Sequence, residues 1–192
     1  MTKTKGAAAL PLNTILAGDC IAEMNAHGID IRLLDGEVTH VAGVRVIGAT
    51  LWTDMALFSD DPQRNQMIVT RSLRDFGAIR ATPVRSFAAS DWLDMHHRDR
   101  DAILSALDTP YDGATLVMTH HVPVREMVHP ARLVGSIDRQ RIAAGFASDL
   151  WSEIRTRQVH TWVCGHSHDN SDLTLEGDQG SIRFVSNARG YP

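Results

Sequence analysis

One stretch decides the fold of this 192-residue chain: Thr161-Trp162-Val163-Cys164-Gly165-His166-Ser167-His168. A short apolar run of β type ends in glycine, and two histidines two positions apart follow it. A second run of the same design, residues 114–119, ends in His120-His121-Val122-Pro123. Because open α/β sheets bind their ligands outside the carboxyl ends of the strands, the two runs predict one histidine-rich site at such an edge.

The histidines at these strand ends are candidate metal ligands. In an extended segment residues i and i+2 point the same way, so His166 and His168 are expected to address one locus, near His120. Neutral imidazole is the commonest side-chain ligand for borderline divalent ions. The alternative interpretation is that His120 and His168 only cap their own strand ends through hydrogen bonds.

Composition limits the classes of function. The chain is 43% hydrophobic and 22% charged, as in an ordinary soluble domain, and its length predicts one domain. A net charge of −4 without a basic run gives no electrostatic footprint for nucleic acid. The two cysteines, far apart, favour a reducing compartment. Because no membrane span or convincing signal peptide is recognisable, we expect a cytoplasmic protein without membrane partners.

The pattern of apolar residues predicts an α/β fold with a mixed sheet. Alternating runs on either side of Ala42-Gly43 indicate a hairpin, and a helix is expected to begin at Asp60-Asp61-Pro62. In the helix capped by Ser90, His96 and His97 are expected to be packing or surface residues rather than ligands. The expected helices are 19–27, 62–76, 91–107 and 138–155, and the expected strands are 12–16, 31–34, 37–41, 44–48, 114–119, 159–164, 173–176 and 181–186.

These motifs resemble the bacterial calcineurin-like metallophosphoesterases over roughly residues 31–192. The matching residues are Thr119–Pro123 and Gly165–His168, supported by Gly43–Asp54 and Val185–Tyr191. The resemblance implies a layered β-sandwich flanked by helices. It also implies hydrolysis of a small phosphate ester with two divalent ions, Mn, Zn or Fe.

The resemblance also implies roles for individual histidines. Carried over by motif, His120 and His166 would bind one metal ion and His168 the other. His121 would either support these ligands or face the substrate, and it is the candidate catalytic residue.

Three amino-terminal motifs of the family, DxH, GDxxD and GNH[DE], are not intact in this chain, so the resemblance implies an N-terminally truncated fold. Leu16-Ala17-Gly18-Asp19 is similar to the start of the second motif, and Asp19 is the candidate carboxylate ligand. Without a bridging carboxylate two cations repel each other, whereas three imidazoles can hold one Zn²⁺ with an open water position. The alternative to a hydrolase is therefore a non-catalytic metal-binding or interaction module.

Residues 12–25 resemble a different family, the start of adenine-specific DNA methyltransferases of the cell-cycle-regulated bacterial type. The DPPY segment of that family is absent, so methyl transfer is not expected. The sequence suggests a short segment of foreign origin at 1–30 joined to a metallophosphoesterase-like domain at 31–192, or else a chance similarity. Loss of the first strands would expose a sheet edge, through which copies of the chain could form a homo-oligomer.

Overall fold

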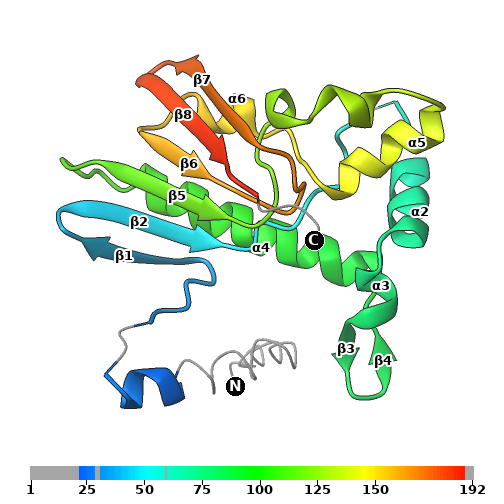
Figure 1. Cartoon of the computed structure of the whole chain (residues 1–192). Helices are drawn as coiled ribbons and strands as arrows, with labels where there is room; N and C mark the ends of the chain where they lie inside the picture. Colours follow the sequence, from blue (N-terminus) through cyan, green and yellow to red (C-terminus); the bar gives the residue numbers. More distant parts are fainter. Residues whose placement is uncertain (1–21, 29–30, 59, 189–192) are drawn as a thin grey trace, which may run out of the picture.

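A six-stranded mixed sheet forms the centre of the computed structural model, which describes residues 22–28, 31–58 and 60–188 (Figure 1). The strand order is β1-β2-β5-β6-β8-β7. Strands β2, β5, β6 and β8 run parallel, and the outer strands β1 and β7 are antiparallel to their neighbours. The bounds are β1 Glu37–Val41, β2 Val44–Ala49, β5 Thr115–Thr119, β6 Thr161–Val163, β7 Ser171–Gly177 and β8 Gly180–Ser186. The predicted α/β class with a mixed sheet is confirmed.

Both predicted hairpins are present. Strands β1 and β2 pair antiparallel through the turn at Ala42 and Gly43, whose φ angles are 48° and 78°. Two successive positive φ angles are typical of the type I′ turn, whose twist matches that of the flanking strands. Strands β7 and β8 likewise pair along their whole length. By contrast, residues 31–34, expected as a strand, form no regular element, and the hairpin of β3 (Arg80–Thr82) and β4 (Arg85–Ser86) was not predicted.

The helix starts follow the local polar chemistry. Helix α2, Pro62–Ser72, begins where predicted, and the Asp61 side chain accepts a hydrogen bond from the backbone N–H of Arg64. It ends at Ser72, earlier than expected, and the separate helix α3, Asp75–Ala78, follows. The long helix α4, Ala89–Asp108, does not use Ser90 as its cap. Its first turn is closed instead by the Asp91 carboxylate, which accepts from the backbone N–H of Ala88.

The helix expected over residues 138–155 is broken, so this prediction is wrong. The segment forms α5 (Ile137–Arg141), a 3₁₀ turn η3 (Ile142–Gly145) and α6 (Trp151–Ile154). Between them the backbone pairs with the chain after β5: Val122 N–H donates to the Phe146 carbonyl, and Ser148 N–H donates to the Val122 carbonyl. The apolar residues spaced four apart in this segment, Ile142, Phe146, Leu150 and Ile154, therefore do not share one continuous helix.

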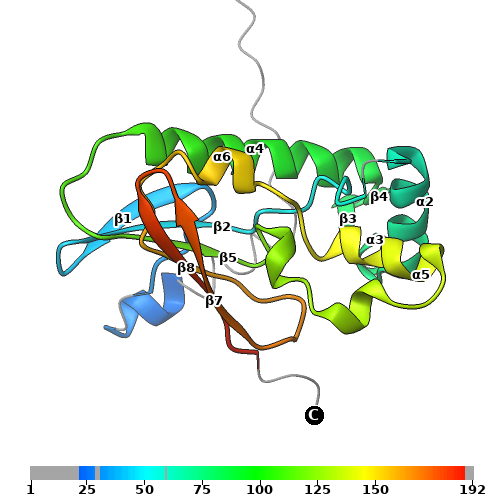
Figure 2. The ribbon, with the colours of Figure 1, turned by 90° about the horizontal axis from the view of Figure 1, so that it is seen from above.

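Within the part of the chain that the structure describes, helices cover one face of the sheet and leave the other largely uncovered (Figure 2). Figure 2 shows α4 and α6 along one side of the strands. On that face Val117, Trp162 and Phe184 are fully buried and cross-strand neighbours, whereas Met118, on the opposite face, is 46% exposed. Among the described residues the only other sheet is the β3–β4 hairpin, so they supply one large sheet rather than the two layers of a sandwich.

The expected amino-terminal segment, 1–30, is described only in part. Residues 22–26 are helical, in agreement with the helix expected over 19–27, and a turn follows at 27–28. The expected strand at 12–16 lies outside the described residues, as does most of the methyltransferase-like stretch. Within the described ranges we find no helix with the length and apolar character needed to cross a membrane.

Candidate functional site

The topology brings the two histidine-terminated runs side by side. Strands β5 and β6 are adjacent and parallel, with Met118 opposite Val163, so their carboxyl ends lie at the same edge of the sheet. The backbone N–H of Gly165 donates to the His120 carbonyl and continues the pairing past the last strand residue. As a result His166 Nδ1 lies 3.0 Å from His120 Nε2. The predicted meeting of these two histidines at one edge is confirmed.

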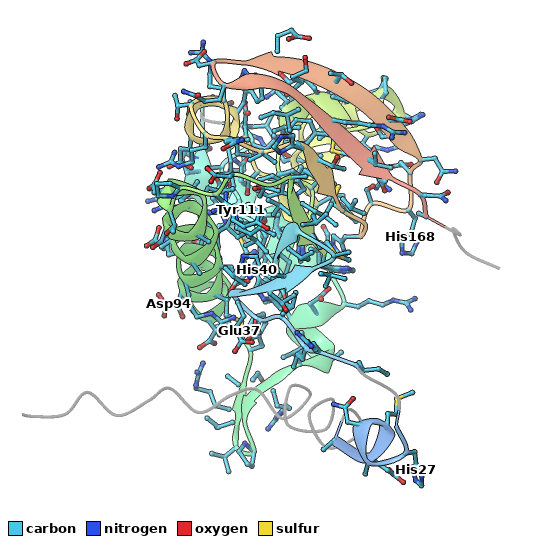
Figure 3. All side chains as sticks on the ribbon, turned by 90° about the vertical axis from the view of Figure 1, so that its left-hand side faces the viewer. His27, Glu37, His40, Asp94, Tyr111 and His168 are labelled. Atoms are coloured by element: carbon cyan, nitrogen blue, oxygen red, sulfur yellow. The ribbon has the colours of Figure 1, made fainter. Side chains whose placement is uncertain are left out.

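The segment that carries His166 and His168 is a bend, so the expectation of an extended segment is wrong. Both histidines have φ of 58°, in the left-handed region that residues with a Cβ rarely adopt. The Ser167 N–H turns back to the Gly165 carbonyl, 2.6 Å away, which closes a tight turn instead of continuing the strand. His168 is exposed at the rim of the site (Figure 3). Burial is the main cause that lowers the pKa of His120 and of His166, and the nearby His168 acts on both in the same direction.

His166 is held among other rings. Its ring centroid lies 4.2 Å from that of His121, 4.7 Å from that of His120 and 4.9 Å from that of Phe146. Its Nε2 atom is buried and has no hydrogen-bond partner. Burial is the main cause that lowers the pKa of His166 to about 4, with His120 and His168 acting in the same direction and the Gly145 carbonyl against them. The ring is therefore neutral at pH 7, the form that binds metal ions.

His121, the candidate catalytic residue, lies beneath this pair. Its side chain is only 1% exposed and packs against the rings of Trp52 and Trp92. Its Nδ1 atom is 3.4 Å from the Thr50 carbonyl oxygen, and its Nε2 atom is buried without a partner. Burial, together with the neighbouring histidines, lowers its pKa well below the usual value. This placement fits support of the other histidines, and it separates the ring from any substrate in solvent.

The chain after β2 fixes the backbone of His120 and His121. The Thr50 carbonyl accepts hydrogen bonds from the backbone N–H groups of both histidines. The next residue, Leu51, has φ of 51°, and its N–H donates to the buried carboxylate of Asp99, 2.9 Å away. A nitrogen of His96 bonds the Trp52 carbonyl. Helix α4 thus clamps the Thr50–Trp52 strap through Asp99 and His96.

Some residues of this site were predicted from the sequence, and others were not. His96 was expected to be a packing residue, and its burial and its bond to a backbone carbonyl confirm this. Asp99 was missed, because one of several aspartates on a helix carries no spacing signal of its own. The left-handed backbone of Leu51 was also missed. It lies within Gly43–Asp54, a stretch that the family resemblance had singled out.

The predicted ligands come together only in part. His120, His121 and His166 are neighbours, and His168 lies at the rim. Asp19 lies outside the described residues. Within the described ranges no three His, Cys, Asp or Glu side chains are arranged around one position that could hold a metal ion. A scan against models of known protein families and a search of the curated proteins find no match to this chain.

Proposed function

We propose that this chain is a metal-dependent hydrolase of small phosphate esters, of the metallophosphoesterase type, with His120 and His166 as ligands of one divalent ion. The observation that carries the proposal is the 3.0 Å separation of His166 Nδ1 and His120 Nε2 at the ends of adjacent parallel strands. Two nitrogen ligands of a tetrahedral Zn²⁺, each about 2.05 Å from the metal, lie about 3.3 Å apart. The observed separation of the two nitrogens is therefore within about 0.3 Å of the one that a shared ion requires.

The electrostatics of the site supports the same proposal. Metal ions bind unprotonated imidazole, and burial lowers the pKa of both rings, which favours the neutral form at pH 7. A divalent ion supplies an activated water and neutralises phosphoryl oxygens. In this proposal His168, which is exposed at the rim, would hold a second ion of Mn, Zn or Fe together with a carboxylate, for which Asp19 is the candidate. His121, buried below, supports the pair from within the core.

The rest of the proposed assignment follows from the fold and the composition. The six-stranded sheet would be one layer of the family's sandwich, and its uncovered face, with Met118 46% exposed, is where a second layer would pack. The net charge of −4, without a basic run, argues against nucleic acid as the substrate. Cys164 is a buried free thiol, which supports a reducing, cytoplasmic setting.

Metal content and turnover, measured on the same preparation, test this proposal. Purified protein is loaded with Mn²⁺, Zn²⁺ or Fe²⁺, desalted and analysed for bound metal. It is then assayed on a chromogenic phosphate monoester and a chromogenic diester. We expect at least one bound ion and turnover that a His120→Ala/His166→Ala double variant loses. His27→Ala, which changes an exposed histidine on the amino-terminal turn (Figure 3), is the matched control. Equal turnover in wild type and double variant would reject the proposal.

A second candidate function is a non-catalytic metal-binding or interaction module. The observation in its favour is that the described residues offer no third ligand converging with His120 and His166. This candidate predicts that metal binds without measurable hydrolysis of either ester.

We further propose that copies of the chain associate through the exposed edge of β1, an outer strand of the sheet whose residues are mostly exposed.

A further inference from the structure

Arg132 lies beside the histidine bend and contacts its backbone. The residue sits in the 3₁₀ turn η2, Pro130–Leu133, within the long connection after β5. Its Nη2 donates to the Ser167 carbonyl, and its Nε lies 2.6 Å from the Asp169 carboxylate. One guanidinium group thus bonds the backbone of Ser167, which lies between His166 and His168, and the side chain of Asp169, which follows them.

The same guanidinium also supports the other side of His166. Its central carbon lies 4.5 Å from the centre of the Phe146 ring, in a cation–π contact. The Phe146 ring in turn packs against His166, with centroids 4.9 Å apart. Arg132 therefore reaches His166 by two routes, through the Ser167 carbonyl and through Phe146.

The backbone of the bend needs such support. His166 and His168 both hold φ of 58°, a conformation that persists only where the surroundings impose it. The bonds made within the bend are local: Ser167 N–H to the Gly165 carbonyl, and Asp169 N–H to the Ser167 hydroxyl. The Gly165 N–H ties the start of the bend to the His120 carbonyl, and Arg132 ties its middle and end to the connection after β5.

We propose that Arg132 is a positioning residue of the histidine site: it holds the Gly165–Asp169 bend and the Phe146 ring so that His166 stays directed at His120. This inference rests on the function proposed above for its metal readout, but its structural readout does not need metal. Arg132 is not assigned a contact with substrate or with an ion. A planar guanidinium is required, because lysine cannot both stack on Phe146 and donate to two acceptors in a fixed geometry.

The alternative is that Arg132 and Asp169 form an ordinary surface ion pair, of the kind that contributes little. Their side chains are 30% and 25% exposed, compared with 58% and 57% for the pair formed by Arg183 and Asp172 on β8 and β7. That second pair makes the matched control, because it also joins an arginine to an aspartate but touches no histidine of the site. Arg183→Gln removes an ion pair and leaves the bend intact.

The experiment compares wild type, Arg132→Gln, Arg132→Lys and Arg183→Gln by hydrogen–deuterium exchange of metal-free protein and by calorimetric titration with Zn²⁺. We expect amide exchange in residues 165–169 to accelerate at least about tenfold in Arg132→Gln, with exchange in β5 unchanged. Zn²⁺ affinity should fall about ten- to a hundredfold, the range seen when a supporting partner of a ligand is lost. In Arg132→Lys both the exchange rate of residues 165–169 and the Zn²⁺ affinity should lie between those of Arg132→Gln and wild type. In Arg183→Gln both should match wild type.

The outcomes separate this inference from the function on which it rests. If wild type takes up no metal, the proposed hydrolase fails, and the exchange data alone decide the role of Arg132. If wild type binds Zn²⁺ and Arg132→Gln shows wild-type exchange and affinity, Arg132 is a surface ion pair and the inference is overturned. If Arg132→Gln does not fold, Phe146→Leu replaces it. That change removes only the contact of Arg132 with His166 through Phe146, so it should change amide exchange and Zn²⁺ affinity in the same direction but by less. Wild-type exchange in Phe146→Leu and Arg132→Lys together would equally overturn the inference.

Discussion

His166 Nδ1 and His120 Nε2 lie 3.0 Å apart, although 46 residues separate the two histidines in the sequence. The parallel pairing of β5 and β6 creates this contact, because both strands end at the same edge. A hydrogen bond between the two rings needs one nitrogen to donate and the other to accept. Protonating both rings would bring two donors face to face. The contact between the two rings is therefore sensitive to pH.

The stability of the metal-free protein should fall as the pH is lowered from about 6.5 to about 4. In the folded state the pKa of His166 is lowered from 6.5 to about 4, so between these values only the unfolded chain takes up the proton. The unfolded state then binds more protons, and the free energy of unfolding decreases with acid by about 1.4 kcal/mol per pH unit for each such imidazole. His121 and His120, whose pKa values are also lowered, add in the same direction.

Urea unfolding at several pH values, with a chelator present, measures this slope. His166→Gln should make the slope shallower, since glutamine does not titrate, and His27→Gln, at an exposed position, should leave it unchanged. A slope that is the same in His166→Gln and wild type would show that the site histidine is not the group responsible.

Zn²⁺ should stabilise the folded protein, and a chelator should reverse the effect. A ligand that binds only the folded state adds about 2.7 kcal/mol at a free concentration one hundred times its Kd. We expect the thermal unfolding midpoint of wild type to rise with Zn²⁺ concentration and that of the His120→Ala/His166→Ala variant to stay constant. The control is Mg²⁺, an ion that prefers oxygen ligands and should have a smaller effect on an imidazole pair. Equal shifts in wild type and variant would place the metal elsewhere on the chain.

Asp99 should be needed to hold the Thr50–Trp52 strap, whose Thr50 carbonyl accepts the backbone N–H groups of His120 and His121. Its carboxylate is fully buried and accepts the N–H of Leu51, which would otherwise be left without a partner. Asp99→Ala should lower the free energy of unfolding by about 1–3 kcal/mol, the cost of an unsatisfied buried donor. Asp99→Asn should cost less, because it keeps an acceptor in place without a buried charge. Burial disfavours that charge and raises the pKa of the Asp99 carboxyl.

The control for Asp99 lies on the same helix. Asp94→Ala removes an exposed carboxylate from α4 (Figure 3) and should change stability by no more than about 0.5 kcal/mol. Chemical unfolding of the three variants, with Zn²⁺ affinity as a second readout, checks the prediction. An Asp99→Ala variant as stable as Asp94→Ala would show that the Leu51 N–H finds another partner.

The parts of this structure that depend on local pattern could be read from the sequence. Alternation around Ala42-Gly43 predicted the first hairpin, and the apolar runs before His120 and His166 predicted the strands that place both rings at one edge. What failed depended on contacts distant in sequence. The helix over 138–155 is broken because its backbone pairs with Val122, and the bend at His166 is held by Arg132. Neither partner is marked by spacing or by propensity.

Association of the chain should depend on the edge of β1. The two outer strands of the sheet differ. Strand β7 carries two acidic residues, Asp172 and Glu176, which discourage pairing with another chain, whereas β1 carries one, Glu37, and exposes Val38 and Val41 at 42% and 57%. We expect sedimentation of wild type to show a concentration-dependent dimer. Val41→Lys should weaken this dimer at least about tenfold, because a lysine on an edge strand opposes strand addition.

The control is Val84→Lys, at the tip of the β3–β4 hairpin, where the valine is 90% exposed. It makes the same chemical change away from the sheet and should leave the dimer intact. If both lysine variants weaken association equally, the effect is one of charge and not of the β1 edge. If wild type is a monomer at every concentration, this edge is not an interface.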